Sequence, residues 1–418
     1  MSKMAGWITV MAAIAVLGGC ESGSETGGSG ASNDYVFKKS FGAAIHLSDI
    51  AVDMTGDIYA AGVEYDANRD RKGVVIKLDK DGNSDSAFGN GGIARNAKSG
   101  AVNAIALLHE NGETKSVIGG DLFVEKNDYD RDYLMTLWKF DAHGTLDSGF
   151  GTAGALTDPF EKKRAAAVQL GIDDAGRIVV AGDNYSLLNQ TSYLWRFKAD
   201  GFADTAFNGV GFLETNAVTY LQNGRFIVQP QGALLFIGSH VGDNGSGSQQ
   251  YLQRYLASGE LDAGFGSGGV VIDTRSILEC AQQSRLVSSA VQAANGRIFT
   301  AGSSCENGNA DVVVLGYESD GSVCGTFGDN GKLVIDEGGA EEGVALALDN
   351  SGNLVVAGNY EKGHEADGML WKIDQNGHIL DRKKVSGSFS AMKTAPDGDI
   401  VVGGREDSSG ATIWKFHW

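Results

Sequence analysis

The segment GELDAGFGSGG, residues 259–269, recurs along this chain of 418 residues and decides its fold. Four other segments keep its order of glycines and phenylalanine: GNSDSAFGNGG at 82–92, GTLDSGFGTAG at 144–154, GFADTAFNGVG at 201–211 and GSVCGTFGDNG at 321–331. We call each copy a glycine phrase. A single copy would suit a ligand loop, a calcium loop or a turn. Five copies favour a turn that builds the frame of a repeat protein.

Two further patterns recur with the glycine phrase. Short apolar runs such as GRIVVAG end at Gly62, Gly120, Gly182, Gly238, Gly302, Gly358 and Gly404. Each is followed by a third run: VVIKLD, TLWKFD, YLWRFK, YLQRYL, VVLGYE, MLWKID or TIWKFH. Apolar or alternating runs bounded by Gly, Asp and Asn are typical of strands. With one stretch before and one after, they predict four strands in each of seven units.

The two ends of the chain complement one another. The seventh unit stops at Trp418 without a glycine phrase or a fourth strand, whereas YVFKKSFG at 35–42 is an extra strand before the first unit. An N-terminal strand that completes the last unit would close a ring and remove the free sheet edge. We therefore predict an all-β, seven-bladed β-propeller of four-stranded blades over residues 34–418.

These patterns resemble the delta-60 repeat family of bacterial proteins, in which G-x-L-D-x-x-F-G-x-x-G follows a V-A-G strand. The resemblance runs from about Ile50 to Trp418. Cys324 replaces the Asp in the fifth unit, and GHILDRKKVSG at 377–387 lacks the Phe-Gly ending. The family implies a β-propeller and says little about activity.

A basic residue precedes each Asp of the glycine phrase by eight positions. The pairs are Lys77 with Asp85, Lys139 with Asp147, Arg196 with Asp204, and Arg254 with Asp262. In the fifth unit Gly316 and Cys324 replace both charges together. Because loss of one partner would leave an uncompensated charge, we predict a structural clamp in each of four blades.

The recurring aromatic residues fit the same frame. We expect the phenylalanines of the phrase to fill the gap between neighbouring blades: Phe88, Phe150, Phe207, Phe265 and Phe327. Four tryptophans share one strand position, which indicates packing between blades rather than a row of sugar-binding rings: Trp138, Trp195, Trp371 and Trp414. DKDGNSD at 79–85 begins like a calcium loop, but its counterparts keep the Gly while the acids vary, which favours a turn.

The N-terminus resembles a lipoprotein signal. Trp7–Val16 is too short to cross a bilayer, and LGGC ends at Cys20 like the lipobox of bacterial lipoproteins. We expect a signal peptide over 1–19, lipidation of Cys20, and a flexible Gly/Ser tether over 20–33. The alternative is an ordinary cleaved signal with an incidental cysteine. The resemblance implies export and an anchor in the bacterial envelope, at the periplasmic side of the outer membrane or the cell surface.

The net charge of −19 without a basic cluster opposes nucleic-acid binding. No G-x-S-x-G, H-E-x-x-H or phosphate-binding loop occurs in the sequence. The seven histidines share no position in the repeat and have no metal-ligand spacing. These observations weaken an enzymatic interpretation without excluding one.

If the strands of a blade alternate in direction, the loops between blades share a face with the loops that join the second and third strands. We call this the variable face, because its polar loops differ between units. Its candidate interaction residues are Asp128, Asp130, Asp132, Asp243, Glu361, His364, Glu365 and Asp367. Cys280 and Cys305 fall on the same face, so we predict a disulfide between them and an unpaired Cys324 on the other face.

These observations favour a non-enzymatic, lipid-anchored propeller that acts as a binding or scaffold protein at the cell envelope. Its partner would be an envelope protein or an extracellular ligand, with membrane contact through the anchor alone. The alternative is a propeller hydrolase or lyase with its site at the mouth of the central channel. We expect no cofactor; a divalent cation such as calcium would suit the acidic loops under either hypothesis.

Overall fold

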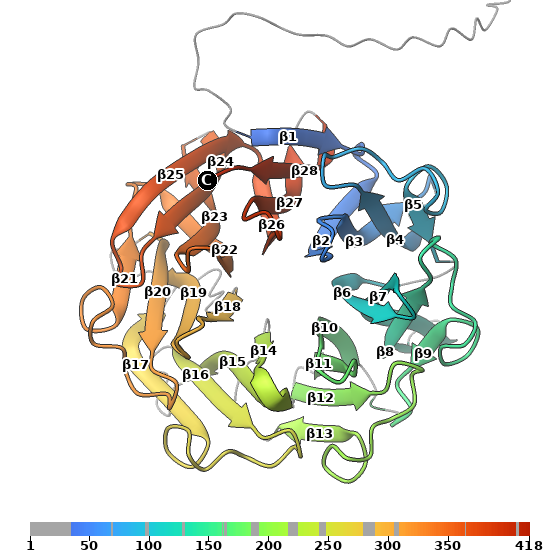
Figure 1. Ribbon diagram of the computed structural model, residues 1–418, viewed down its shortest axis with the longest axis horizontal. Coiled ribbons are helices and arrows are strands. Elements are labelled where there is room, and N and C mark those ends of the chain that lie inside the picture. Colours follow the sequence, from blue (N-terminus) through green and yellow to red (C-terminus); the bar gives the residue numbers. More distant parts are fainter. Residues whose placement is uncertain are drawn as a thin grey trace, which may run out of the picture. The chain divides into compact units, whose positions relative to one another are not determined.

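The computed structural model describes residues 35–67, 70–96, 100–127, 130–160, 162, 165–184, 192–215, 225–241, 248–278, 289–304, 309–363, 365–406 and 409–418. Asp34–Trp418 is one compact unit. Within it, the described elements are strands in seven four-stranded sheets, together with one 3₁₀ turn, η1 (Pro230–Gly232). The sheets are arranged as blades around a central axis (Figure 1). This confirms the predicted seven-bladed propeller.

The first three blades follow the order of the chain from the inside of the ring outward. Blade 1 contains β2 (Ile45–Val52), β3 (Ile58–Tyr65), β4 (Arg71–Leu78) and β5 (Ile93–Arg95). Blade 2 contains β6 (Val102–Glu110), β7 (Glu113–Asn127), β8 (Asp130–Phe140) and β9 (Ala155–Thr157). Blade 3 contains β10 (Ala165–Ile172), β11 (Ile178–Asn184), β12 (Ser192–Phe197) and β13 (Phe212–Thr215).

The next three blades repeat this order. Blade 4 contains β14 (Arg225–Val228), β15 (Leu234–Val241), β16 (Ser248–Tyr255) and β17 (Val270–Leu278). Blade 5 contains β18 (Ser289–Gln292), β19 (Ile298–Ser304), β20 (Asp311–Tyr317) and β21 (Lys332–Ile335). Blade 6 contains β22 (Ala340–Leu348), β23 (Leu354–Lys362), β24 (Glu365–Ile373) and β25 (Ile379–Ser386).

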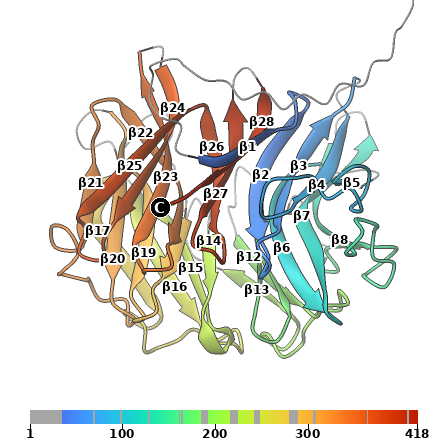
Figure 2. The same ribbon diagram turned by 45° about the horizontal axis from the view of Figure 1, so that its top comes forward.

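Blade 7 joins the two ends of the chain. It contains β26 (Ser388–Thr394), β27 (Ile400–Glu406), β28 (Gly410–Phe416) and, as its outer strand, β1 (Tyr35–Ser40). β1 pairs antiparallel with β28, and Ser40 Oγ lies 3.0 Å from Thr412 Oγ1 across this pair. Figure 2 shows the blue β1 beside the red strands of the last blade. The N-terminal strand therefore closes the ring, as the sequence predicts.

The core of the propeller lies between the blades, because each sheet packs its apolar side chains against both neighbours. Seven buried apolar clusters occur among the described residues, and each combines side chains of two adjacent blades. The middle strands face a neighbouring sheet on both sides, so all residues of β12 and β20 are buried. Apolar runs in these strands thus follow from burial on both faces.

The recurring glycine of the second strand has a steric reason. The first strands of five blades carry a bulge opposite it, for example between Ala167 and Gln169 in β10, where Ala167 pairs with Gly182. A Cβ atom on Gly182 would overlap the Ala166 carbonyl oxygen and lie 2.7 Å from the Trp195 ring. The bulge brings the two backbones so close that only glycine fits.

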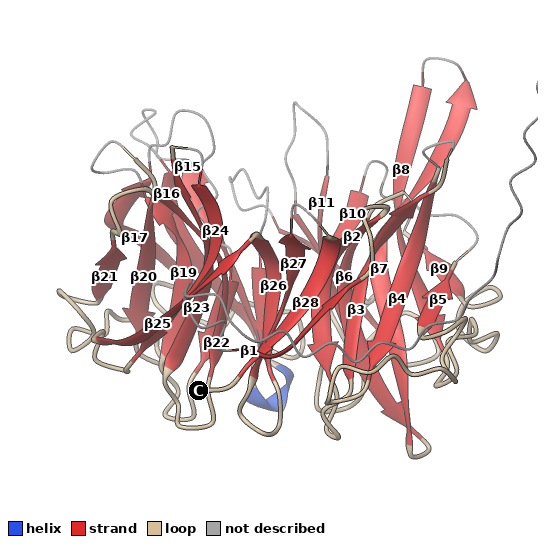
Figure 3. Ribbon diagram, turned by 90° about the horizontal axis from the view of Figure 1, so that it is seen from above, coloured by secondary structure: helices blue, strands red, loops and turns tan. Residues whose placement is uncertain are grey.

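Where it is described, the connection between blades lies on the face of the ring that holds the end of the second strand: Ala340, at the start of β22, pairs with Glu361 near the end of β23. β7 and β8 extend beyond the ring on this side (Figure 3). The segment 121–133, which the sequence suggests is a loop, is therefore largely strand. No helix among the described residues is both long and apolar enough to span a membrane.

Candidate functional site

The glycine phrases form hairpins whose Asp contacts the base on the preceding strand. The nearest Lys or Arg nitrogen lies 2.7 Å from Oδ2 in the pairs Lys77–Asp85, Arg196–Asp204 and Arg254–Asp262. The other oxygen of each Asp accepts a backbone N–H two residues later, for example Gly264 N at 2.9 Å. Each carboxylate thus joins the strand to the turn.

Blade 2 departs from this arrangement. Lys139 Nζ lies 3.5 Å from Asp147 Oδ2 but 2.9 Å from both carboxylate oxygens of Glu110. Lys115 lies closer to Asp147 than Lys139 does, with its Nζ 2.9 Å from Asp147 Oδ2. The predicted two-residue clamp is here a network of four charges. The eight-residue spacing could not reveal Lys115 and Glu110, because they belong to neighbouring strands.

The same bases cross the seam to the following blade. Arg196 Nη1 donates to the Ala257 carbonyl at 2.6 Å, and Arg254 Nη1 donates to the Ser319 carbonyl at 2.6 Å. Their guanidinium carbons lie 4.8 and 4.5 Å from the ring centroids of Phe207 and Phe265, within cation–π range. The five phenylalanines of the phrase are fully buried in clusters between blades: Phe88, Phe150, Phe207, Phe265 and Phe327. The glycine phrase therefore joins blades and leaves no open site.

The fifth and sixth units replace the clamp in different ways. Cys324 is unpaired and fully buried, and a Cβ on Gly316 would lie 3.1 Å from the Phe327 side chain, so the small residues make room for the phenylalanine. In blade 6 the Asp position is Leu380, and Lys372 pairs instead with Asp349 at 2.9 Å. The tryptophans of the shared strand position are buried in clusters between blades: Trp138, Trp195, Trp371 and Trp414.

Only some of the predicted interaction residues lie in the part of the chain that the structure describes. Glu361 lies near the end of β23 and is exposed, and Asp367 lies in β24, where its Oδ2 is 2.7 Å from Lys384 Nζ. Asp128, Asp243 and His364 lie outside the described residues, as do Cys20, Cys280 and Cys305. For three others, Asp130, Asp132 and Glu365, only the strand position is described.

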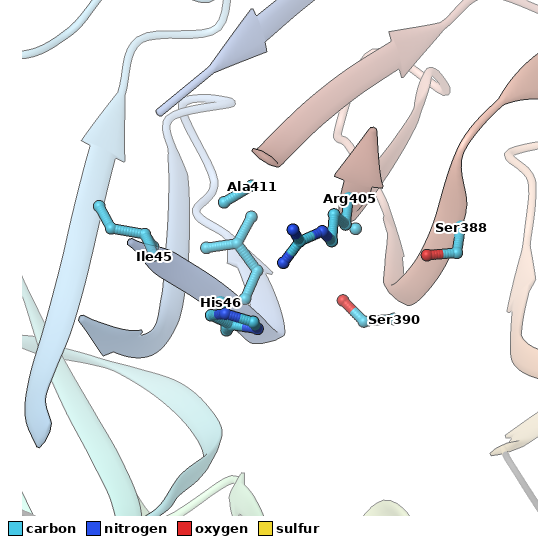
Figure 4. Close-up of a pocket in the computed structure, with 8 residues that line it drawn as sticks. Ile45, His46, Ser388, Ser390, Arg405 and Ala411 are labelled. Atoms are coloured by element: carbon cyan, nitrogen blue, oxygen red, sulfur yellow. The ribbon is translucent and has the colours of Figure 1, made fainter. Parts of the chain in front are cut away.

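A pocket lies between blades 7 and 1, with lining residues from β2, β26, β27 and β28. It has a cavity volume of about 70 Å³ and is lined by Ile45, His46, Leu47, Ser388, Ser390, Gly404, Arg405 and Ala411. In Figure 4 the Arg405 side chain extends into the space between β27 and β2, and the hydroxyls of Ser388 and Ser390 turn toward it. The pocket combines one cation with several hydrogen-bond donors.

The polar groups that line the pocket have few described contacts with one another. Ser390 Oγ donates to the Gly403 carbonyl at 3.1 Å, and the His46 ring packs edge-on against Tyr65 with centroids 5.3 Å apart. Within the described part of the chain, Arg405 forms no ion pair and His46 forms no hydrogen bond with either serine. An exposed guanidinium beside two hydroxyls suits an anionic group, because its planar fork can bind both oxygens of a carboxylate.

Three buried carboxyl groups elsewhere on the variable face have pKa values above their usual range. Burial raises the pKa of Asp121, whose Oδ1 accepts the Ala101 N–H at 2.9 Å. Burial also raises the pKa of Asp158, although it accepts the Trp195 indole N–H at 3.1 Å. Burial, together with the charges of Asp311 and Asp336, raises the pKa of Glu341. Such shifts mark places where charge is costly in the folded chain.

Comparison with known proteins supports the fold. A family model described as "Domain of unknown function (DUF5122) beta-propeller" matches residues 176–207, which include the first part of the third glycine phrase. The solved structure of Sqt1 from Chaetomium thermophilum has 12% identity and a TM-score of 0.50, with 93% of this chain and all of that chain covered. No curated protein matches.

Other similar structures belong to proteins of different kinds. An acylaminoacyl peptidase of Pyrococcus horikoshii has 10% identity and a TM-score of 0.48, and the match covers 89% of this chain but 51% of the peptidase. Drosophila Plexin A in complex with Semaphorin 1b has 9% identity and a TM-score of 0.45, with 91% and 86% of the two chains covered.

Sequence reasoning did not identify the residues that line this pocket. Arg405 begins one of the variable loops, REDSSG at 405–410, and His46 is one of seven histidines without a shared repeat position. One signal was available in the sequence, the predicted closure of the ring. Closure makes blades 7 and 1 neighbours, so polar residues at the ends of their strands lie close together.

Proposed function

We propose that this chain is a non-enzymatic binding protein of the bacterial cell envelope, anchored by lipid at Cys20, that holds an anionic group of its ligand in the pocket between blades 7 and 1. The pocket carries the proposal, because Arg405 provides a charge that the described residues do not neutralise. It is a local cation in a chain of net charge −19. A site of this kind favours a carboxylate on an extracellular molecule or on an envelope protein.

The test measures binding of matched small molecules to the chain from residue 20 onward. We expect glucuronate and N-acetyl-aspartate to bind in calorimetry, and their neutral counterparts glucose and N-acetyl-asparagine amide to give no heat. Arg405→Gln should weaken carboxylate binding about tenfold or more, since a charged hydrogen-bonded contact is lost. Arg71→Gln is the matched control, because Arg71 is an exposed cation of the same face in blade 1.

Two results would contradict the binding hypothesis. One is the absence of carboxylate binding at concentrations up to about 10 mM, where even a weak site would fill. The other is equal loss of binding in Arg405→Gln and Arg71→Gln, which would mean a general charge effect. The anchor has its own test: Cys20→Ser should prevent labelling by a radioactive fatty acid and release the chain from the membrane fraction. Continued labelling would place the lipid elsewhere.

An enzymatic role for the same pocket is favoured by one observation, that His46 lines it together with Ser388 and Ser390. A hydrolase or lyase at this place would need His46 to approach a serine or the substrate as a general base. Turnover of a neutral ester that is lost in His46→Gln and kept in Arg405→Gln would support this alternative. Turnover that persists in His46→Gln would remove it.

A further inference from the structure

Three carboxylates converge on the variable face where blade 5 meets blade 6. Asp311 begins β20, Asp336 follows β21, and Glu341 lies near the start of β22. One oxygen of each carboxylate lies within 4.8 Å of an oxygen of each of the others. The Glu341 N–H donates to the Ala310 carbonyl at 2.6 Å, which fixes the two blades against each other at this point.

The burial of the cluster distinguishes it from an ordinary acidic loop. Glu341 is 0% exposed and Asp311 is 1% exposed, whereas Asp336 opens to solvent. Glu341 Oε1 accepts the Gly339 N–H at 3.0 Å, but Glu341 Oε2 is buried without a hydrogen-bond partner among the described residues. In the same part of the chain, neither Glu341 nor Asp336 forms an ion pair with Lys or Arg. A buried carboxylate in this state strongly disfavours folding unless a cation compensates it.

A hydroxyl group points to the same place. Ser304 ends β19 and pairs directly with Asp311 across the ladder between β19 and β20. Directly paired residues project to the same side of a sheet, so the Ser304 hydroxyl lies on the side of the Asp311 carboxylate. Ser304 Oγ is buried and, within the described residues, has no hydrogen-bond partner. The cluster thus presents an oxygen that no described residue satisfies, independently of its acids.

We propose that Asp311, Asp336, Glu341 and Ser304 bind a calcium ion that ties blade 5 to blade 6. Calcium takes oxygen ligands at about 2.3–2.6 Å, so two ligands of one ion lie at most about 5 Å apart, in agreement with the spacing of the carboxylates. All four groups are hard oxygen ligands, which suit calcium better than zinc or copper. The ion neutralises the buried charge and occupies the space in front of Glu341 Oε2.

Calorimetric titration of the chain with calcium chloride tests the site. We expect one calcium ion per chain and little heat from magnesium, which dehydrates reluctantly. Calcium at about 5 mM should raise the apparent Tm by about 1–3 °C, because an ion that binds only the folded chain stabilises it. Glu341→Gln should abolish this rise. Without calcium its Tm should equal or exceed that of the parent chain, because one buried charge is removed.

The matched control is Glu361→Gln, which removes an exposed carboxylate from the same blade and should keep the full calcium response. Absence of a calcium response in the parent chain would overturn the proposal, and so would an unchanged response in Glu341→Gln. If Glu341→Gln failed to fold, Ser304→Ala would decide, since it should weaken calcium binding without altering the charge. Arg405→Gln should retain the response, so failure of the binding pocket and failure of the calcium site are separate results.

Discussion

The two faces of the ring use carboxylates in opposite ways. On the glycine-phrase face, the hydrogen bond from Lys77 lowers the pKa of Asp85. Burial alone would raise the pKa of Asp204, but the Arg196 charge lowers it. On the variable face, burial raises the pKa of Asp121 and Glu341. The two clamp carboxylates thus gain stability from their basic partners, whereas Asp121 and Glu341 are charges that are costly in the folded chain, as charges at binding sites often are.

Removing an aromatic ring from a seam between blades should give the largest difference in the free energy of unfolding between variants of the two faces. Phe207 is fully buried between blades 3 and 4 beneath the Arg196 guanidinium. Phe207→Ala should therefore lower the free energy of unfolding by about 3–5 kcal/mol. Arg71→Gln on the variable face should change it by less than about 0.5 kcal/mol. Denaturant unfolding of both variants measures the contrast. Similar losses would mean that the glycine phrase is not the main joint between blades.

A glycine substitution tests whether the first and second strands of a blade approach each other closely at the bulges. Gly182→Ala should cost about 2–3 kcal/mol, because its Cβ has no room beside the Ala166 carbonyl and the Trp195 ring. Gly209→Ala is the matched control: Gly209 has φ 73° but no atom within 4 Å of its added Cβ. It should lose only about 1 kcal/mol through backbone strain. Equal losses in denaturant unfolding would show that conformation rather than contact requires Gly182.

Removing the C-terminal residue should have a smaller effect on the free energy of unfolding. Trp418 packs in the cluster between blades 6 and 7, and its indole N–H donates to Asp381 Oδ2 at 2.6 Å. Deletion of Trp418 should lower the free energy of unfolding by about 1–2 kcal/mol, because the ring is only partly buried. Leu380→Ala, which removes a side chain that is 52% exposed in the adjacent blade 6, should have almost no effect. Thermal unfolding that failed to separate the two variants would argue against a seam role for Trp418.

The sequence predicts what repeats and misses what occurs once. Blade number, ring closure and buried phenylalanines follow from periodic patterns, because each blade meets its neighbours in the same way. The seam between blades 7 and 1 lacks a glycine phrase, and there the ring of Phe37 takes the phenylalanine's place. A Cβ on Gly82 would lie 2.7 Å from Phe37, just as one on Gly321 would lie 2.9 Å from Phe265. No repeat position marks Phe37 for this role.

The candidate sites are hidden from the sequence for the same reason. The pocket joins His46 to Arg405, and the acidic cluster joins Asp311 to Glu341 across a seam. None of these residues belongs to a recurring motif, and their partners come from neighbouring blades rather than from a fixed spacing. Pairs within one hairpin, such as Arg254 with Asp262, could be predicted because eight residues separate them in every copy.

The pH dependence of the free energy of unfolding should show the smallest difference between the two kinds of carboxylate, but it tests their charges directly. The pKa of Asp204 is lowered in the folded chain, so its contribution is complete above the unfolded value of about 3.9 and is lost as the pH falls through the folded pKa. The pKa of Asp158 is raised, so its folded carboxyl takes up a proton at a higher pH than the unfolded one, and acid favours the folded state at this residue.

Asp204→Asn and Asp158→Asn should therefore change the slope of unfolding free energy against pH in opposite directions between about pH 6 and pH 3. The first variant should lose less stability on acidification than the parent chain, because the clamp no longer has a charge to lose. The second should lose more, because it lacks the proton uptake that offsets the loss. Both differences should be at most about 1 kcal/mol, since solvent screens charges near the surface. Parallel slopes in the two variants would mean that the two faces do not differ in how they hold charge.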